Sequence, residues 1–296
     1  MQALGRALPL RLWYDARKEI EQGMIRTSVS LTVQYDSAFS PFPASAFDRG
    51  LEWARATGFD AVELILCRPS LVDAEVIGAK LAGQGLVLST ISTGQAVGMD
   101  GLSMTAADEQ VRVATRRRLF EQIDFSARLG RPNVTIGLMR GKGGLLPREA
   151  ELGLLRSELR EVAGYAARRS VVMNLEPINR YECSLLNSSE AVYDLLREIG
   201  NPESVGVLYD TFHSNIEDAD MIKTIRRIGH RIAHVHVADS NRRLPGEGHT
   251  DFPGIVRALE AAGFGGYASL EVLNDPSAEH VIEFSKIRLD AILKPL

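Results

Sequence analysis

Short apolar segments of β type alternate along the chain with longer segments whose apolar residues recur at helical spacing. Apolar runs of about four to eight residues between turn signals are typical of buried strands, and recurrence every three or four residues is typical of amphipathic helices. The expected strands cover residues 25–33, 61–66, 86–92, 133–138, 171–176, 204–210, 232–238 and 267–272. The expected helices cover residues 46–57, 73–84, 106–129, 148–169, 189–199, 218–228, 252–262 and 278–293.

Strict alternation of strands and helices predicts a parallel sheet, because parallel neighbours need a crossover connection. The first expected strand leads into Gln34-Tyr35-Asp36-Ser37 and not into the glycine-rich phosphate turn that opens many doubly wound sheets. We therefore expect an α/β protein with one closed (β/α)8 TIM barrel. No Pro-rich linker or low-complexity segment divides the chain. We expect residues 24–296 to form the catalytic barrel and residues 1–23 to be an N-terminal extension.

Composition narrows the class of protein. Hydrophobic residues make up 45% of the chain and charged residues 24%, which is usual for a globular protein with a large core. The net charge is -4 and no long basic run occurs, which argues against sequence-independent nucleic-acid binding. No apolar run has the length of a membrane span, and Cys67 and Cys183 match no disulfide framework or metal-binding spacing. We expect a cytoplasmic protein with no membrane partner.

The last four expected strands carry acidic residues or histidines near their carboxyl ends. In a barrel these ends meet at the catalytic rim. Alternation along strand seven places both of its histidines on the inward face. The residues that we expect to converge are Glu176, Asp210, His236 and Glu271. His234 lies one rung deeper, where we expect a hydrogen-bonded core histidine rather than a ligand.

Three carboxylates and an imidazole inside a barrel are costly to bury unless a cation compensates them. Oxygen-rich ligands favour Mn2+, with Mg2+ and Co2+ as alternatives; the competing interpretation is a buried charge network without metal. A bound cation with open positions can polarise a ketone and stabilise an enediolate. Glutamates on opposite sides of the carbon that loses its proton can then serve as base and acid. This pattern predicts a sugar epimerase or isomerase that acts by proton transfer.

Four segments resemble the motifs of one enzyme group. Residues 174–182 read NLEPINRYE, residues 208–217 read LYDTFHSNIE, residues 234–243 read HVHVADSNRR, and residues 269–271 read SLE. These resemble the motifs of the D-tagatose/D-psicose 3-epimerase group, within the xylose-isomerase-like barrel superfamily of sugar isomerases and epimerases. The resemblance covers the chain from about residue 24 onward and is most specific between Asn174 and Glu271.

The resemblance implies specific roles for the matched residues. The implied metal ligands are Glu176, Asp210, His236 and Glu271. Two of them, Glu176 and Glu271, would also form the proton-transfer pair. The implied contacts to the substrate's carbonyl end and hydroxyls are Glu182, His213 and Arg242.

The chain departs from the ketohexose epimerases in its aromatic residues. Its only tryptophans are Trp13 and Trp53, and the loop after strand four reads LMRGKGG at residues 138–144. Arg140 and Lys142 in that loop and Arg68 after strand two, together with Arg242, are candidate contacts for an anionic substrate such as a sugar acid or phosphate. Ordinary solvated charge is the alternative interpretation. The GKGG run lacks the spacing of a P-loop.

Other reactions suit the same metal site. Hydroxypyruvate-type isomerases, inosose-type dehydratases and keto-sugar-acid decarboxylases use related enolate chemistry, and one sequence does not decide among them. A metal-dependent endonuclease is less favoured, because it would need more histidine and acid ligands and a basic face. A non-catalytic sugar-binding module is disfavoured because both glutamates of the acid–base pair are present. We expect a small sugar or sugar-acid substrate and a homo-oligomer, either a dimer or a tetramer.

Overall fold

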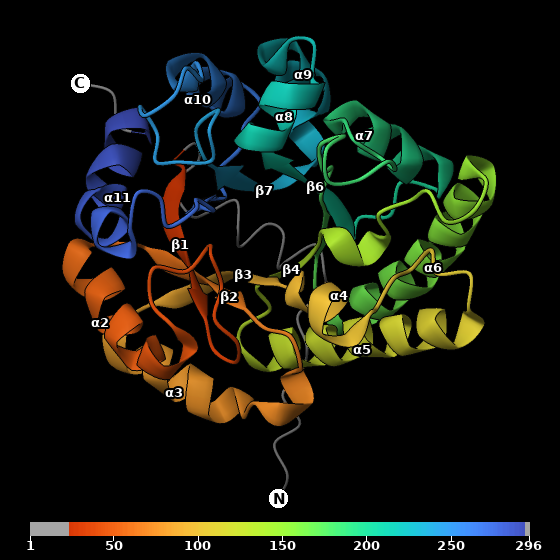
Figure 1. Cartoon of the computed structure of the whole chain (residues 1–296), viewed down its shortest axis with the longest axis horizontal. Helices are drawn as coiled ribbons and strands as arrows, with labels where there is room; N and C mark the ends of the chain where they lie inside the picture. Colours follow the sequence, from red (N-terminus) through yellow and green to blue (C-terminus); the bar gives the residue numbers. More distant parts are fainter. Residues whose placement is uncertain (1–23, 294–296) are drawn as a thin grey trace, which may run out of the picture.

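The computed structural model describes residues 24–293, so the predicted extension at residues 1–23 lies outside the described residues. Parallel strands close into a barrel in the order β1 to β8, and helices surround it (Figure 1). The strands are β1 (Arg26–Thr32), β2 (Ala61–Ile65), β3 (Val87–Ser92), β4 (Asn133–Ile136), β5 (Met173–Leu175), β6 (Val205–Asp210), β7 (Ile232–Val237) and β8 (Tyr267–Leu270). This closed barrel confirms the predicted single-domain TIM fold.

Helices and short 3-10 turns connect the strands. The α-helices are α2 (Phe47–Thr57), α3 (Ala74–Gln84), α4 (Gln95–Asp100), α5 (Glu109–Arg128), α6 (Arg148–Arg169), α7 (Ser189–Glu198), α8 (Thr211–Glu217), α9 (Met221–Ile228), α10 (Phe252–Ala261) and α11 (Ala278–Leu293). The 3-10 turns are η1 (Ala44–Ala46), η2 (Pro69–Leu71), η3 (Leu138–Arg140) and η4 (Gly229–Arg231). None of the described helices combines the length and apolar character that a membrane crossing requires.

Two short helices, α4 and α8, were not predicted from the sequence. Helix α4 follows β3 after a few residues, and α8 follows β6 directly, so both lie on the side of the barrel where the strands end. Capping residues explain two boundaries that differ from the prediction. The carboxylate of Asp108 accepts a hydrogen bond from Gln110 N at 2.8 Å, so α5 begins at Glu109. Likewise Asp220 accepts from Lys223 N at 3.0 Å, so α9 begins at Met221.

The apolar core lies between the strands and the surrounding helices. In β1, Val29 and Leu31 are buried in that core, as alternation along a strand requires. Ser28 and Ser30, which alternate with them, are polar and lie inside the barrel, where Ser28 Oγ is 2.7 Å from Ser89 Oγ of β3. Buried polar groups of this kind need partners to offset desolvation. The barrel interior therefore holds hydrogen-bonded polar side chains and can accept charged ones.

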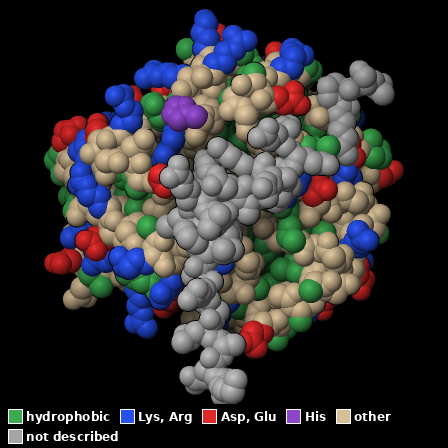
Figure 2. Space-filling model, turned by 180° about the vertical axis from the view of Figure 1, so that it is seen from behind, with side chains coloured by type: hydrophobic (Ala, Val, Ile, Leu, Met, Phe, Trp, Pro, Cys, Tyr) green, Lys and Arg blue, Asp and Glu red, His purple; other side chains and the backbone are tan. Residues whose placement is uncertain are grey.

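The face opposite to the view of Figure 1 shows how surface charge is distributed. Lys and Arg side chains lie mostly around the margin of that face, with Asp and Glu side chains among them (Figure 2). On the part of this face that the described residues leave visible, positive charge does not gather into one continuous patch. Mixed charge of this kind is typical of an ordinary solvated surface.

Candidate metal and proton-transfer site

Four elements bring the predicted ligands together at the strand ends. Asp210 is the last residue of β6 and also caps α8, because its carboxylate accepts from Phe212 N at 2.7 Å and His213 N at 3.1 Å. Glu176 follows β5 directly, and Glu271 follows β8 directly. The backbone N–H of Glu271 donates to Val237 O at 3.2 Å, which continues the sheet pairing beyond the strand.

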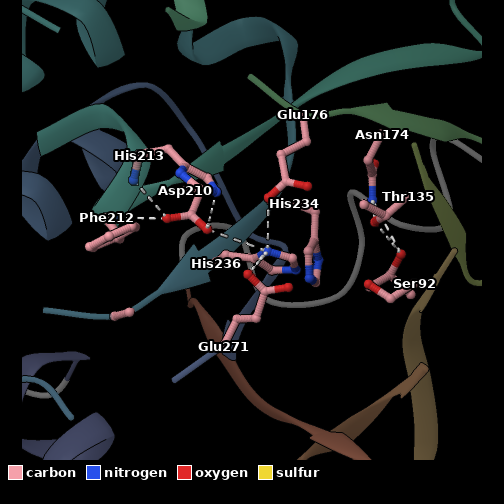
Figure 3. A network of polar contacts seen from close by, with 12 residues as sticks. Ser92, Thr135, Asn174, Glu176, Asp210, Phe212, His213, His234, His236 and Glu271 are labelled. Carbon is pink, nitrogen blue, oxygen red and sulfur yellow. Dashed lines mark hydrogen bonds and ion pairs between the residues drawn. The ribbon is translucent and has the colours of Figure 1, made fainter. Parts of the chain in front are cut away.

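The side chain of His236 lies at the centre of three carboxylates (Figure 3). His236 Nδ1 is 3.4 Å from Glu176 Oε1, 3.2 Å from Glu271 Oε2 and 3.7 Å from Asp210 Oδ2. One ligand atom from each of the four residues lies within 4.8 Å of all the others. The structure therefore brings together the four residues that the sequence predicted as ligands.

The chemistry of this donor set fits a divalent cation. His236 Nδ1 is buried and has no hydrogen-bond partner among the described residues, although carboxylate oxygens surround it. Asp210 is fully buried and Glu176 is 6% exposed, so water compensates little of their charge. Three carboxylates and one imidazole are ligands that Mn2+, Mg2+ and Co2+ accept. Glu176, Asp210, His236 and Glu271 would hold such an ion.

Electrostatics at the centre favour positive charge. Burial lowers the pKa of His236, but the charges of Glu271 and Glu63 outweigh burial and raise that pKa well above its ordinary value. Burial raises the pKa of Asp210, yet Arg242 and His213 outweigh it and hold that pKa well below its usual range. The pKa of Glu176 is raised, chiefly by burial. A cation placed among these groups would therefore be stabilised.

Arg242 lies against two of the candidate ligands. Its Nη1 donates to Asp210 Oδ1 at 2.9 Å and to Oδ2 at 2.8 Å, and its Nη2 contacts Glu271 Oε2. The guanidinium also lies over the rings of Phe39, at 5.3 Å, and Phe212, at 4.8 Å. The predicted substrate-binding arginine is thus inside the site and 6% exposed.

The other two residues implied for substrate contact are joined through Asn179. Asn179 Nδ2 lies 2.8 Å from His213 Nδ1 and donates to Glu182 Oε1 at 2.8 Å. His213 is buried, with its Nε2 3.9 Å from Asp210 Oδ2, whereas Glu182 is exposed. Asn179 was assigned no role from the sequence, although it belongs to the same motif.

The structure corrects the expectation for Arg140. Its side chain is fully buried, and the guanidinium donates to backbone carbonyls of Glu176, Leu185 and Leu186. Burial lowers the pKa of Arg140, but the donors are already used, so this side chain does not meet a substrate anion. Neither the predicted contact with an anionic substrate nor the alternative of solvated charge fits Arg140, because carbonyls of the segment after β5 enclose its guanidinium. Lys142 in the same loop is exposed, as expected.

Arg68, in the segment after β2, is held by Tyr35 from the loop after β1 and by Asp100 at the end of α4. Its Nε donates to Asp100 Oδ1 at 3.0 Å, and its Nη1 donates to Tyr35 Oη at 2.8 Å. Arg118 also contacts Asp100, at 2.8 Å. The charge of Arg68 is therefore shared with a carboxylate, and this side chain offers little free charge to an anion.

Sequence reasoning missed Glu63, a fully buried carboxylate in β2. Glu63 lies 3.1 Å from His236 Nε2 and 3.3 Å from His234 Nε2. A signal for it was present, since Glu63 is the one charged residue in the apolar strand AVELI. A charge within such a strand needs a buried partner. His234 is buried and bonded to Glu63, and it is not among the four residues around His236 Nδ1.

Residues 51–288 match the family described as xylose isomerase-like TIM barrel. The chain belongs to that family. It is 31% identical over 230 residues to L-ribulose 3-epimerase of Mesorhizobium japonicum, a match that covers 77% of this chain and 75% of the relative. It is 29% identical over 227 residues to ketose 3-epimerase of Arthrobacter globiformis, which covers 76% and 77% of the two chains. The chain is therefore an enzyme of the isomerase class.

Solved structures agree with this assignment. The structure of an L-ribulose 3-epimerase is 28% identical to this chain, with a TM-score of 0.74 and coverage of 89% of this chain and 86% of the other. The 3-keto-D-glucoside 4-epimerase of E. coli gives a TM-score of 0.75 at 19% identity, covering 90% and 98% of the two chains. At that identity the likeness shows the fold alone.

Proposed function

We propose that this chain is a ketose 3-epimerase that works with one divalent cation, Mn2+ by preference. The observation that carries the proposal is the buried, unpartnered Nδ1 of His236, which faces carboxylate oxygens of Glu176, Asp210 and Glu271 at 3.2 to 3.7 Å. When bound there, the cation would polarise the ketone and neutralise part of the charge that develops as the neighbouring proton leaves. The names of the relatives support sugar epimerisation as the reaction.

Epimerisation at one carbon needs a base on one face of the substrate and an acid on the other. Glu176 and Glu271 come from β5 and β8, and their ligand oxygens approach within 4.8 Å of one another. One glutamate removes the proton from C3, leaving an enediolate, and the other returns a proton to the opposite face. The bond that breaks and the bond that forms are both C3–H, so the substrate and product have the same composition.

The remaining residues orient the substrate in this proposal. Arg242 and His213 contact Asp210 and present N–H groups near the reacting end. Glu182, linked to His213 through Asn179, lies at the exposed edge of the site. Each of these groups can bond to a carbonyl or hydroxyl of a sugar. Removal of any one would weaken binding or orientation without removing the acid–base pair.

Charge near the site favours a neutral ketose over a sugar acid or phosphate. Arg140 is occupied by backbone carbonyls, and Arg68 is paired with Asp100. Arg242, also considered for an anion, is paired with Asp210 and Glu271. Among these four basic residues, only Lys142 is exposed with a side chain that no described carboxylate pairs. A single exposed lysine on a loop is weak support for an anion site. We therefore propose a free ketose as the substrate.

A substrate panel tests the function directly. Ketopentoses and ketohexoses, ketose phosphates, keto-sugar acids and hydroxypyruvate are incubated with the Mn2+-loaded enzyme in deuterated water. We expect the neutral ketoses to give the C3 epimer with deuterium at C3, and EDTA to abolish turnover. Glu176→Gln and Glu271→Gln are each expected to lower kcat by at least about 10³-fold, because each removes an acid–base group. Turnover of hydroxypyruvate alone, or full activity in metal-free enzyme, would refute the proposal.

Three further predictions belong to the same proposal. We expect the protein to be cytoplasmic. We also expect it to form a dimer or tetramer, and light scattering of the purified protein measures the mass of that assembly. We also expect residues 1–23 to be dispensable for catalysis, since the proposed site residues all lie after them. A truncated chain that starts at Met24 should keep kcat within a few-fold of the parent.

A further inference from the structure

Glu63 is buried in the polar interior of the barrel, below the ring of candidate ligands. Its carboxylate accepts a hydrogen bond from Ser92 Oγ at 2.6 Å. The same carboxylate lies 3.1 Å from His236 Nε2 through both oxygens and 3.3 Å from His234 Nε2. Three groups from β3 and β7 therefore hold this one side chain of β2. Neither proton transfer nor substrate contact in the proposed function uses it.

The two ring nitrogens of His236 face different surroundings. Nε2 faces Glu63, whereas Nδ1 faces Glu176, Asp210 and Glu271 and has no hydrogen-bond partner among the described residues. A neutral imidazole has one N–H and one lone pair, and an ionised carboxylate can only accept. A hydrogen bond to Glu63 therefore requires the proton on Nε2. The lone pair is then on Nδ1, which is the nitrogen that can bind a cation.

We propose that Glu63 is a positioning residue that fixes the ring orientation and tautomer of His236 for the divalent cation. His234 and Ser92 hold the Glu63 carboxylate in turn, and the rings of His234 and His236 lie nearly perpendicular, at 84°. Carboxylates that orient metal-binding histidines in this way raise ligand basicity, and their loss typically weakens metal affinity about 10- to 100-fold. The inference rests on the proposed cation at His236.

Another arrangement of the same atoms is a second cation held by Glu63, His234 and His236. The hydrogen bonds favour the positioning role, because Glu63 Oε1 already accepts from Ser92 and both oxygens lie at hydrogen-bond distance from His236 Nε2. A cation there would also need the Nε2 lone pairs of both histidines. Metal stoichiometry separates the two arrangements, since one ion per chain fits the positioning role and two ions fit the other.

Glu63→Gln is the decisive variant. Its amide keeps the size of the side chain but replaces one acceptor oxygen with an NH2 donor, so it cannot accept from all three groups. Full-length protein stripped with EDTA is titrated with Mn2+ by calorimetry, and Co2+ is bound separately to record its visible absorption spectrum. We expect the variant to bind Mn2+ about 10- to 100-fold more weakly and to show altered Co2+ bands. Neither readout needs a substrate.

Two further variants test the role of Glu63 even if Glu63→Gln folds poorly. Ser92→Ala removes one donor to Glu63 and should weaken Mn2+ binding by a few-fold. Thr135→Val is the matched control, since Thr135 is buried in the same interior and bonds to Thr90 and Asn174 rather than to Glu63. It should bind Mn2+ within about two-fold of the parent and give the parent's Co2+ spectrum.

The outcomes separate the two proposals. A Glu63→Gln protein with the parent's Mn2+ affinity and Co2+ spectrum would overturn the role of Glu63 and leave the cation site intact. A parent enzyme that epimerises ketoses but binds no Mn2+, Mg2+ or Co2+ would overturn both. Two Mn2+ ions per chain in the parent, with one lost in Glu63→Gln, would make Glu63 a direct ligand and refute the positioning role.

Discussion

Arg242 donates through Nη1 to both carboxylate oxygens of Asp210, at 2.9 and 2.8 Å, while its Nη2 contacts Glu271. The backbone of Arg242 has φ of 63°, in the left-handed region that non-glycine residues rarely adopt. Such a conformation costs on the order of 1 kcal/mol and persists where surrounding contacts hold it. Asp210 and Glu271 are also candidate metal ligands, so the guanidinium and a bound divalent cation would act on the same two carboxylates.

Arg242→Gln tests this shared compensation. Removing one partner of a buried ion pair leaves an uncompensated charge, so the free energy of unfolding in EDTA should fall by roughly 3–5 kcal/mol. The stabilisation that Mn2+ adds should then exceed that of the parent, because the cation becomes the main compensation for Asp210. Urea denaturation with and without Mn2+ measures both quantities.

A neighbouring arginine provides the control for that measurement. Arg243 pairs with Asp275 at 2.8 Å, but both side chains are more than 40% exposed. Exposed pairs contribute little, so Arg243→Gln should change the free energy of unfolding by less than about 1 kcal/mol, with or without Mn2+. An equal Mn2+-induced stabilisation in Arg242→Gln and the parent would show that the two cations do not share these carboxylates.

The residues around His236 could be predicted from the sequence for a physical reason. Alternating strands and helices predict a barrel, a barrel brings the carboxyl ends of its strands together, and the acids and histidine stand at those ends. Alternation in β7 then sets which side of the strand faces inward, and His234 and His236 are both buried inside the barrel. The order of the strands and the alternation of side chains along each strand are regular, so both follow from the pattern of apolar and polar residues alone.

The surroundings of these residues did not follow from pattern. Arg140 and Lys142 are two residues apart in one irregular loop, yet one is fully buried and the other exposed. Which of them turns inward depends on the carbonyls of a second loop, after β5, and no local periodicity records that contact. Glu63 was missed because its two histidine partners come from β7, which does not pair with β2 and lies 171 and 173 positions away in the chain.

Gly137→Ala should damage catalysis through Glu176. A Cβ at Gly137 would lie 2.4 Å from Glu176 Oε2, so the buried carboxylate has to move. Displacement of a reacting group by about 1 Å can lower the rate about 100-fold, and we expect a loss of that order in kcat for the ketose. Gly153→Ala in α6 is the control, since nothing lies within 4 Å of its added Cβ. A folded Gly137→Ala enzyme with the parent's kcat would refute this role of the glycine.

Substitution should destabilise the fold strongly at Arg140 and hardly at all at Lys142. Arg140→Met removes a donor from the buried carbonyls of Glu176, Leu185 and Leu186, and each carbonyl left unsatisfied should cost about 1–3 kcal/mol in the free energy of unfolding. Lys142→Ala changes an exposed side chain and should alter the free energy of unfolding by less than about 0.5 kcal/mol. If the substrate is a neutral ketose, the KM of Lys142→Ala should stay within about two-fold of the parent. A ten-fold rise in KM for a ketose phosphate, with that phosphate as the better substrate, would restore the anionic interpretation.

Asp218 makes the free energy of unfolding depend on pH, and this effect does not involve the metal centre. Asp218 follows α8, its Oδ1 accepts a long hydrogen bond from Ser189 N at 3.4 Å, and its Oδ2 is buried without a hydrogen-bond partner among the described residues. Burial raises the pKa of Asp218 to about 6. Between about pH 4 and pH 6 the folded state then binds more protons than the unfolded state, so this residue's contribution to stability falls as the pH rises through that range.

Asp218→Asn removes that ionisation while keeping the oxygen that accepts from Ser189. The variant should be more stable than the parent at pH 7.5, by on the order of 2 kcal/mol, because the parent must bury a charged carboxylate there. At pH 4 the parent's carboxyl is protonated in the folded state, so the difference should shrink toward zero. Urea denaturation of both proteins at several pH values in EDTA gives the difference directly. A difference that stays constant from pH 4 to pH 7.5, or a variant that loses stability relative to the parent as pH rises, would show that Asp218 ionises without penalty in the folded protein.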